Sequence, residues 1–344
     1  MSIVVGMSGG VDSATAAALL KELGEDVVGV TLFFSPTSSC CDLAATARAR
    51  AQCEYLGIRW HHVDVREAFE QEIVERFWTQ TLSGETPNPC VWCNEVIKWR
   101  SLLSVAAAIG ADRVATGHYA RIERSARGVR LCRASDRAKD QTYFLYRLTE
   151  EQRSRTVFPL AGMTKQQTVD RSAEFFPAAV TAKRESQDLC FLTGGLRNGV
   201  LARHIAVPGE VVDKQGNVLG CHDGLALHTI GQRSGIGVSA SHPLYVVGKD
   251  ARANRLVVGR RDDCMFSSFR VHSLQWSDLP TATPTEFDAD VVVRYRAAPV
   301  RAHVTRIAPD MMTVDLMVSV FAATPGQSAV FYENDAILGG GIIV

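Results

Sequence analysis

Long apolar runs are absent from this sequence of 344 residues. No segment has the ~20 consecutive apolar residues that a membrane-spanning helix needs. No basic residue precedes the apolar residues 3–5, so we expect no signal peptide. Internal periods of ~20–50 residues, which are typical of repeat proteins, are absent as well. These absences favour a globular cytoplasmic protein of two or three domains.

An excess of charge of one sign is also absent, because 37 Lys and Arg residues balance 37 Asp and Glu residues. Proteins that bind nucleic acids often have a basic excess, although the affinity for phosphates depends on local patches. Local basic excess occurs at residues 98–100, 121–137 and 183–184. Each of these stretches is either a solvated surface or a phosphate contact.

The first half of the chain alternates short β-rich runs with helical stretches. The expected strands cover residues 3–5, 27–32, 59–63 and 113–116. The expected helices cover residues 12–23, 43–56, 68–82 and 93–108. This alternation indicates right-handed βαβ crossovers and an α/β fold with a doubly wound parallel sheet. Ligands of such sheets bind at the carboxyl ends of the strands.

From about residue 205 the pattern changes to short strand-like runs punctuated by Pro and Gly. Helical stretches nearly vanish from this part of the chain. It therefore predicts a small barrel or sandwich, preceded by a short linking domain. Gly339, Gly340 and Gly341 are interpreted as a tight turn of this barrel.

A glycine loop lies between the first expected strand and the first expected helix. Its residues are Gly6, Met7, Ser8, Gly9, Gly10, Val11, Asp12 and Ser13. Adjacent glycines let backbone N–H groups surround an anion, the two serine hydroxyls can donate to phosphate oxygens, and the helix N-terminus adds partial positive charge. No Gly-Lys-Ser/Thr follows, so the loop is not of the Walker type. The alternative is a tight turn that only opens the helix.

The run Ser-Gly-Gly-Val-Asp-Ser in this loop resembles the loop of the PP-loop ATP pyrophosphatases. The resemblance implies cleavage of ATP between its α and β phosphates, transfer of AMP to a substrate oxygen, and retention of pyrophosphate in the loop. It also implies Mg²⁺, because the departing pyrophosphate is highly charged. Asp12 is the nearby acid that can help to place this ion.

Cysteines supply the second group of candidate residues. Residues 86–94 read Thr-Pro-Asn-Pro-Cys-Val-Trp-Cys-Asn, and Cys93 is expected to open a helix, where a thiol has a lowered pKa. Cys90 and Cys93 can also be half of a zinc site, a redox pair or a coincidence. A further candidate, Cys190, lies in the run Ser-Gln-Asp-Leu-Cys-Phe at residues 186–191.

Structural zinc is disfavoured, because it needs two more ligands at short spacing and the candidates Cys40 and Cys41 are adjacent. In a cytoplasmic protein the nine cysteines are expected to be thiols, ligands or transient catalytic disulfides. Packing roles are expected for Cys53, Cys132, Cys221 and Cys264.

Several short strings, in order along nearly the whole chain, carry a more specific resemblance. They lie at residues 8–13, 86–94, 115–121, 139–141, 186–191, 229–233, 294–296, 324–327 and 338–341. The chain is similar to the tRNA-uridine 2-sulfurtransferase family, the 2-thiouridylases that modify the wobble uridine of certain tRNAs. The resemblance implies a PP-loop domain, a small central domain and a C-terminal β-barrel. We place these domains at residues 1–197, 198–262 and 263–344.

The same resemblance implies roles for individual residues. The glycine loop, Leu32 and Gly117 lie around ATP, whereas Cys93 is the nucleophile and Cys190 carries a persulfide. The residues implied to face tRNA are Lys139, Asp140, Gln141, Arg294 and Tyr295. Those implied to contact the target base are Asn88, Pro89 and Cys90.

The implied reaction begins with adenylation of the uridine 2-oxygen, after the base has been flipped into the cleft. A cysteine desulfurase or a sulfur-relay protein loads Cys190 with the persulfide sulfur. That sulfur attacks C2 directly or is released as sulfide. Both routes end in a disulfide between Cys93 and Cys190.

One residue departs from the family pattern. Cys90 stands at a position where the usual form of the motif has an Asp. A thiol with a pKa of about 8.5 is mostly protonated at neutral pH and replaces that acid poorly. Cys90, Cys93 and Cys190 can instead hold an iron–sulfur cluster with one open iron site. The alternative functions are another adenylating PP-loop reaction, which uses an amine nucleophile, and a non-catalytic tRNA-binding protein.

Three further side chains near these motifs have two interpretations each. His118 either contacts the nucleotide or base, or packs within a loop. Trp92 and Trp99 either stack on RNA bases or lie in the core, and the core is the preferred interpretation.

Overall fold

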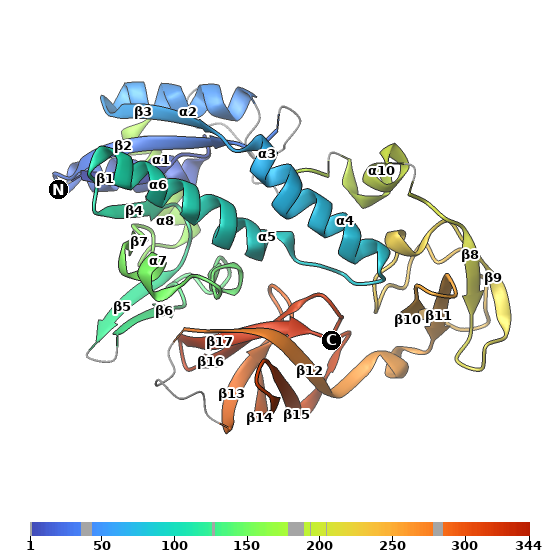
Figure 1. Ribbon diagram of the computed structural model, residues 1–344. Coiled ribbons are helices and arrows are strands. Elements are labelled where there is room, and N and C mark those ends of the chain that lie inside the picture. Colours follow the sequence, from blue (N-terminus) through green and yellow to red (C-terminus); the bar gives the residue numbers. More distant parts are fainter. Residues whose placement is uncertain are drawn as a thin grey trace.

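The computed structural model describes residues 2–35, 43–125, 128–177, 189–192, 194–203, 205–277 and 285–344. Figure 1 shows three parts, namely a parallel sheet flanked by helices, a small sheet at the right of the view, and a barrel below. Within the described ranges, no helix is both long enough and apolar enough to cross a membrane.

The N-terminal part is built on a five-stranded parallel sheet. In spatial order its strands are β3 (Arg59–Asp64), β2 (Asp26–Phe33), β1 (Ser2–Gly6), β4 (Arg113–Thr116) and β7 (Thr156–Val157). All neighbouring strands run parallel, and Gly6 lies opposite Val30 on one side and Thr116 on the other. The chain crosses from one side of β1 to the other after β3, which confirms the predicted doubly wound sheet. The crevice for a ligand therefore lies at the carboxyl end of β1.

Helices cover both faces of this sheet. They are α1 (Val11–Glu22), α2 (Leu43–Leu56), α3 (Arg66–Phe69), the π-helix η1 (Glu70–Val74), α4 (Glu75–Leu82), α5 (Pro89–Trp92), the π-helix η2 (Cys93–Lys98), α6 (Trp99–Ile109), the 3₁₀ turn η3 (Thr142–Phe144), α7 (Glu150–Ser154) and α8 (Lys165–Phe175). Side chains of a strand alternate between its two faces. Ile3 and Val5 therefore pack with α1 and α2, whereas Val4 packs with Trp99 and Leu102 of α6.

A second, four-stranded sheet follows in the chain. Its spatial order is β10 (Tyr245–Asp250), β11 (Arg255–Gly259), β8 (Gly209–Val212) and β9 (Val218–His222). Its helical elements are α10 (Gly195–Ala202) and the 3₁₀ turns η4 (Leu225–Leu227) and η5 (Arg261–Cys264). Val211, Val246 and Leu256 belong to a small core of its own, so this sheet is a separate packing unit.

The C-terminal part is a closed six-stranded barrel, which confirms the fold that the family resemblance implied. The strand-like runs alone predicted either a barrel or a sandwich. In spatial order its strands are β12 (Met265–Trp276), β15 (Met311–Phe321), β14 (Val300–Ala308), β13 (Glu286–Val292), β16 (Ser328–Glu333) and β17 (Ala336–Ile343), and β17 pairs with β12. A hairpin from the N-terminal part, β5 (Arg121–Ser125) and β6 (Gly128–Cys132), adds to the same sheet, because Ala336 pairs with Cys132. The barrel is thus joined to the N-terminal part by backbone pairing.

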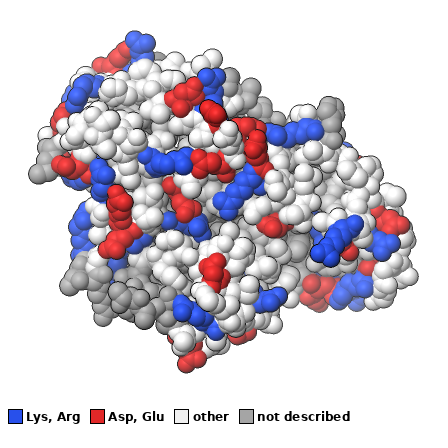
Figure 2. Space-filling model, in the orientation of Figure 1, with Lys and Arg blue, Asp and Glu red and all other residues white. Residues whose placement is uncertain are grey.

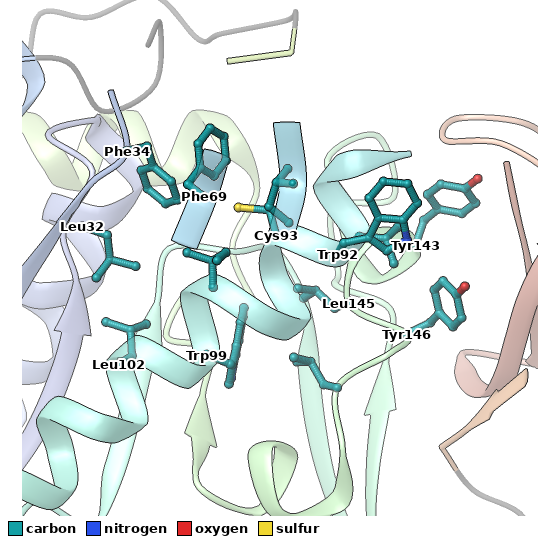
Figure 3. Close-up of a cluster of buried hydrophobic side chains, with 14 of the residues drawn as sticks. Leu32, Phe34, Phe69, Trp92, Cys93, Trp99, Leu102, Tyr143, Leu145 and Tyr146 are labelled. Atoms are coloured by element: carbon teal, nitrogen blue, oxygen red, sulfur yellow. The ribbon is translucent and has the colours of Figure 1, made fainter. Parts of the chain in front are cut away.

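One apolar cluster also connects the parallel sheet with the barrel. It contains Leu32 of β2, Phe69 of α3, Trp99 of α6, and Val330 and Tyr332 of β16. Figure 3 shows its central part, where side chains from β2, α3, α5 and α6 converge. Burial of apolar surface between sheet and barrel therefore stabilises their relative position.

The glycine run near the C-terminus does not form the predicted turn. Gly339, Gly340 and Gly341 lie within β17 and are all buried. A Cβ atom on Gly340 would lie 2.7 Å from the carbonyl oxygen of Ala329 and 2.9 Å from the ring of Tyr146. The prediction of a turn was wrong, because these glycines allow close approach of neighbouring strands and side chains instead.

Gly340→Ala is expected to lower the free energy of unfolding by about 1–3 kcal/mol, because the added methyl group meets a strand backbone and a buried ring. Urea denaturation measures the effect. Gly162→Ala is the control, since a Cβ there has nothing within 4 Å, and it should change stability by less than about 0.5 kcal/mol. Equal stability of the two variants would contradict the close packing at Gly340.

Candidate active site

The glycine loop connects the end of β1 to the start of α1, at the predicted crevice of the parallel sheet. The Ser8 backbone N–H donates to Ser13 Oγ over 3.1 Å, and the two serine hydroxyls also lie 3.1 Å apart. Ser13 Oγ donates to the carbonyl oxygen of Gly10. The loop is therefore a closed turn with both hydroxyl groups at the helix N-terminus, as a phosphate site requires.

Gly9 is the position where this loop needs glycine. Its φ is +71°, and a Cβ there would lie 2.3 Å from the carbonyl oxygen of Ala45 in α2. Arg48 Nε and Gln52 Nε2, also from α2, each donate to the carbonyl oxygen of Gly9 over 3.4 Å. Helix α2 thus fixes the loop from outside.

Asp12 in the first turn of α1 is paired with a lysine that the sequence had not singled out. Lys165 Nζ lies 2.7 Å from Asp12 Oδ1, and the Tyr119 hydroxyl lies 3.0 Å from the same oxygen. Thr164 caps α8 and so places Lys165 at the first helical position. No local feature of the sequence connects this lysine with Asp12, which lies 153 positions away.

Gly117 and Leu32 lie near the glycine loop for different reasons. A Cβ on Gly117 would lie 2.6 Å from the Asp12 carbonyl carbon and 2.7 Å from the Ser13 nitrogen, so only glycine permits this contact. Leu32 is buried near the carboxyl end of β2. Both residues therefore border the same edge of the sheet.

The residues 84–93, which we call the thiol loop, run from the end of α4 to the two cysteines of the Cys-x-x-Cys pair. Helix α5 begins at Pro89, and α5, η2 and α6 follow one another without a break to Ile109. Cys90 therefore lies in the first turn, whereas Cys93 lies one turn inside. The prediction that Cys93 opens the helix was wrong, because proline is preset for the first helical position.

Cys93 and Cys190 border one aromatic cluster. Figure 3 shows the Cys93 sulfur directed toward Phe69. Phe191, the neighbour of Cys190, lies edge-on to Phe69 with 5.9 Å between ring centroids, and to Phe77 with 5.2 Å. Cys93 is buried and Cys190 is half-buried. The fold thus brings two segments that are distant in sequence to the same group of rings.

A pocket of about 470 Å³ opens beside these rings, at the carboxyl edge of the sheet. Its lining includes Phe34, Phe69, Trp78 and Phe191, with charged side chains of both signs at Arg66, Glu67, Glu70 and Arg203. Arg203 is paired with Glu70 over 2.7 Å, so the pocket next to Cys190 has an aromatic wall without an excess of basic groups.

The residues implied to face tRNA occupy two different environments. Asp140 is buried, and its carboxylate accepts hydrogen bonds from the Ala134 N–H at 3.0 Å and the Thr142 hydroxyl at 2.6 Å. Burial raises its pKa. Gln141 Oε1 accepts a hydrogen bond from the Tyr119 N–H. In this structure these two side chains stabilise the turn that carries the half-buried Lys139.

Arg294 and Tyr295 lie on the barrel. Arg294 is exposed, whereas the Tyr295 ring packs on Phe144 with 4.5 Å between centroids and lies 6.4 Å from Tyr143. Tyr143 also shares a side-chain hydrogen bond with Asn88 of the thiol loop. The structure therefore brings the barrel residues next to the residues implied to contact the base.

His118 is half-buried, and its ring packs against the core. Its Nδ1 lies 2.8 Å from the Thr116 hydroxyl, and its ring lies 5.6 Å from that of Trp99. Desolvation, with a smaller effect of Lys98, lowers the pKa of His118 to about 3. Trp92 and Trp99 are both buried, as preferred from the sequence.

The remaining predictions for cysteine have mixed outcomes. Cys53, Cys132 and Cys264 are buried, and burial raises the pKa of Cys53 to about 12. Cys221 is exposed on β9, so the prediction that it packs was wrong. Cys40, Cys41 and the run at residues 186–188 lie outside the described residues.

No group of three His, Cys, Asp or Glu side chains within the described ranges is arranged to hold a metal ion. Cys90, Cys93 and Cys190 all lie in those ranges. Their arrangement in this structure therefore does not fit an iron–sulfur cluster.

Comparison with protein families divides the chain into three matched regions. Residues 1–194 match the family described as tRNA methyl transferase HUP domain, and residues 198–260 match its PRC-barrel domain. Residues 266–343 match an aminomethyltransferase β-barrel domain. The fold and these matches define the class as a HUP-domain protein with two appended β domains.

Relatives narrow the class further. The tRNA-specific 2-thiouridylase MnmA of a Synechococcus species is 44% identical over 99% of this chain and 94% of that protein. The protein of the same name from Heliobacterium modesticaldum is 41% identical over 100% of this chain and 92% of its own length. The chain belongs to the tRNA-specific 2-thiouridylase family.

Among solved structures, a 4-thiouridine synthetase in an RNA complex with bound ATP is 18% identical and covers 51% of this chain and 40% of its own. Its TM-score is 0.35, which is too low to support any inference about this site.

His118→Gln is expected to reduce the loss of stability on acidification. The folded protein resists protonation of His118, whereas the unfolded chain takes up this proton at about pH 6.5, so stability falls as the pH decreases from about 6.5 toward 3. Urea denaturation at pH 7.5 and at pH 5 measures the difference.

His303→Gln is the matched control with the opposite sign. A hydrogen bond with Asp288 raises the pKa of His303, so this residue stabilises the fold at low pH and that contribution is lost as the pH rises through its folded pKa. Removal of the His303 side chain should therefore increase the loss of stability between pH 7.5 and pH 5. If His118→Gln loses as much stability over this range as the wild-type protein, the His118 ring is not desolvated.

Proposed function

We propose that this chain replaces the 2-oxygen of the wobble uridine in tRNA with sulfur, at the expense of ATP. Its family membership supports the reaction class. The observation that carries the proposal for this chain is the position of Cys93 and Cys190, which border one aromatic cluster at the ligand-binding edge of the sheet. A protein that only bound tRNA would need neither thiol there.

The first step uses the glycine loop. Residues 6–13, with Leu32 and Gly117, hold ATP, and Mg²⁺ enters with the nucleotide as its counter-ion. The uridine 2-oxygen attacks the α phosphate, the bond to the β phosphate oxygen breaks, and pyrophosphate leaves into the loop. Lys165 lies beside Asp12 and supplies positive charge where pyrophosphate forms.

The second step transfers sulfur. The terminal sulfur of a Cys190 persulfide attacks C2 of the adenylated uridine, and AMP leaves. The Cys93 thiolate then attacks Cys190 Sγ, which releases the thiouridine and forms a Cys93–Cys190 disulfide. In the alternative order, the Cys93 thiolate first attacks Cys190 Sγ, which forms the same disulfide and releases sulfide. The sulfide then attacks C2, and AMP leaves. A two-electron thiol reductant restores the pair in both orders.

Asn88, Pro89 and Cys90 form the part of the thiol loop that we propose to contact the target base. Asn88 precedes the helix and Cys90 lies in its first turn. This placement puts Cys90 at the position where the family motif has a carboxylate, and we propose that it contacts the base as a backup thiol.

The tRNA is proposed to contact Lys139, Arg294 and Tyr295 while the target base is flipped out, whereas Asp140 and Gln141 act indirectly by holding the turn that carries Lys139. Figure 2 shows charges of both signs interspersed over one face of the protein, so binding there depends on a few local contacts. A cysteine desulfurase or sulfur-relay protein is the proposed donor. We retain residues 1–197, 198–262 and 263–344 as the proposed functional units.

Gly9→Ala is expected to weaken ATP binding by roughly tenfold or more, since a left-handed alanine costs about 1–2 kcal/mol and its methyl group meets α2. Gly24→Ala has a similar φ of +80° but nothing within 4 Å, and it should leave binding unchanged. Calorimetric titration with ATP and Mg²⁺ measures both. Equal affinities of Gly9→Ala and Gly24→Ala for ATP would indicate that ATP binds away from the glycine loop.

Cys93→Ser and Cys190→Ser are each expected to abolish formation of 2-thiouridine while tRNA binding stays within about twofold of wild type. Mass spectrometry of nucleosides after incubation with ATP, undermodified tRNA and a persulfide donor measures the product. Cys221→Ser, which changes an exposed thiol on β9, is the control and should remain active.

Three other results would decide against the proposal. Full activity of Cys190→Ser with a persulfide donor would remove the relay. Pyrophosphate release without any thiolation by the wild-type protein would indicate a different adenylating reaction. The absence of pyrophosphate release in the presence of tRNA would indicate a non-catalytic tRNA-binding protein.

A further inference from the structure

The thiol loop is bound by a turn of the barrel that is far away in the sequence. This barrel turn consists of residues 324–327. The Thr86 N–H donates to the carbonyl oxygen of Pro325 over 2.8 Å, and Gln327 Nε2 donates to the carbonyl oxygen of Thr86 over 2.8 Å. Both backbone polar groups of Thr86 are thus satisfied by the barrel, and the bond from Gln327 spans 241 positions of the sequence.

The close approach depends on glycine. Gly326 has a φ of +90°, and a Cβ there would lie 3.0 Å from both the backbone nitrogen and the carbonyl carbon of Thr86. The turn itself is fixed to the end of β17, because Gly326 N–H donates to the Ile343 carbonyl and Ile343 N–H donates to the Gln327 carbonyl. The barrel therefore presents a rigid surface to the thiol loop.

A second attachment lies two residues further along the loop. Asn88 shares a side-chain hydrogen bond with Tyr143, whose hydroxyl donates to the carbonyl oxygen of Ser328 over 2.9 Å. Ser328 directly follows the barrel turn and begins β16. The loop is thus connected to the same edge of the barrel on both sides of Pro87.

The small central sheet makes a third attachment. A Cβ on Gly84 would lie 3.7 Å from the side chains of Lys249 and Ala251, and Lys249 Nζ donates to the carbonyl oxygen of Glu85 over 3.4 Å. Residues 84–88 therefore lie where all three parts of the protein meet.

The position of Thr86 determines where the thiols of Cys90 and Cys93 lie, because the backbone that leads to them is restricted. Pro87 and Pro89 are both buried and restrict the backbone between Thr86 and the start of α5. Cys90 follows in the first turn of the helix, and Cys93 one turn later. A shift at Thr86 would therefore move the reacting groups, and a displacement of about 1 Å can cost ~10²-fold in rate.

We propose that the barrel turn positions the thiol loop for reaction, with Gln327 as the positioning residue and Gly326 as the residue that permits the contact. This inference rests on the proposed function. It assigns the barrel a part in catalysis besides its part in binding tRNA.

Gln327→Glu tests the proposal, because glutamate keeps the size of the side chain but has no N–H to donate to Thr86. We expect kcat for thiolation to fall roughly ten- to hundredfold while KM for tRNA and for ATP stays within about twofold. Hydrogen–deuterium exchange of peptides covering residues 84–93 should become faster. Gln275→Glu, the same change elsewhere in the barrel, should alter neither quantity.

Each outcome is informative. Faster exchange together with unchanged kcat would overturn the positioning role, and so would unchanged exchange of residues 84–93. A rise in KM for tRNA as large as the expected fall in kcat would indicate that Gln327 contributes to tRNA binding instead. If Gln327→Glu does not fold, Gln327→Asn, which keeps the amide but is one methylene shorter, replaces it with the same expectations.

The exchange measurement separates this inference from the proposed function. If the wild-type protein forms no thiouridine but Gln327→Glu still loosens residues 84–93, the proposed function fails and the contact stands. If the wild-type protein is active and the variant is unaffected in both measurements, the function stands and the inference fails.

Discussion

A single apolar core spans the parallel sheet and the barrel, and the thiol loop is built into it. Leu32 of β2, Phe69 of α3 and Tyr332 of β16 belong to one packed cluster with Cys93. Each fully buried side chain of this kind stabilises the fold by about 1.5–3 kcal/mol. Packing therefore places the thiol loop against the core that the parallel sheet and the barrel share, and the hydrogen bonds at Thr86 attach this loop to the barrel.

The same packing determines the chemical surroundings of the reaction. Phe69, Phe77 and Phe191 surround the region of the two thiols, and Cys93 is itself buried. In the reaction that we propose, an adenylated uridine is an intermediate that water would hydrolyse, and apolar walls would keep water away from it. The polar groups to which we assign the phosphates, among them Lys165 and the two serines of the glycine loop, lie at the adjacent edge of the sheet.

Local patterns were enough to predict the parallel sheet, the glycine loop and a C-terminal part made of short strands, because each depends on neighbouring residues. The choice of a barrel over a sandwich came from the family resemblance. Local patterns failed where distant segments meet. Gly340 looks like a turn residue until β17 passes against Tyr146, and Lys165 has no local feature that connects it with Asp12. Cys93 was placed at a helix start because the helix signal of Pro89 was assigned to the preceding loop. The packing of the segments of Cys93 and Cys190 against one aromatic cluster could not be derived from their spacing in the sequence.

The hairpin β5–β6 has a consequence for how the chain folds. Ala336 of β17 pairs with Cys132, and Val330, Tyr332 and Ile337 face the shared core. Until the N-terminal part is in place, these apolar groups of the barrel have no cover, and uncovered patches of this kind promote aggregation. Synthesis from the N-terminus makes the covering surface first, so the barrel is completed against a partner that already exists. A barrel produced alone would lack that partner.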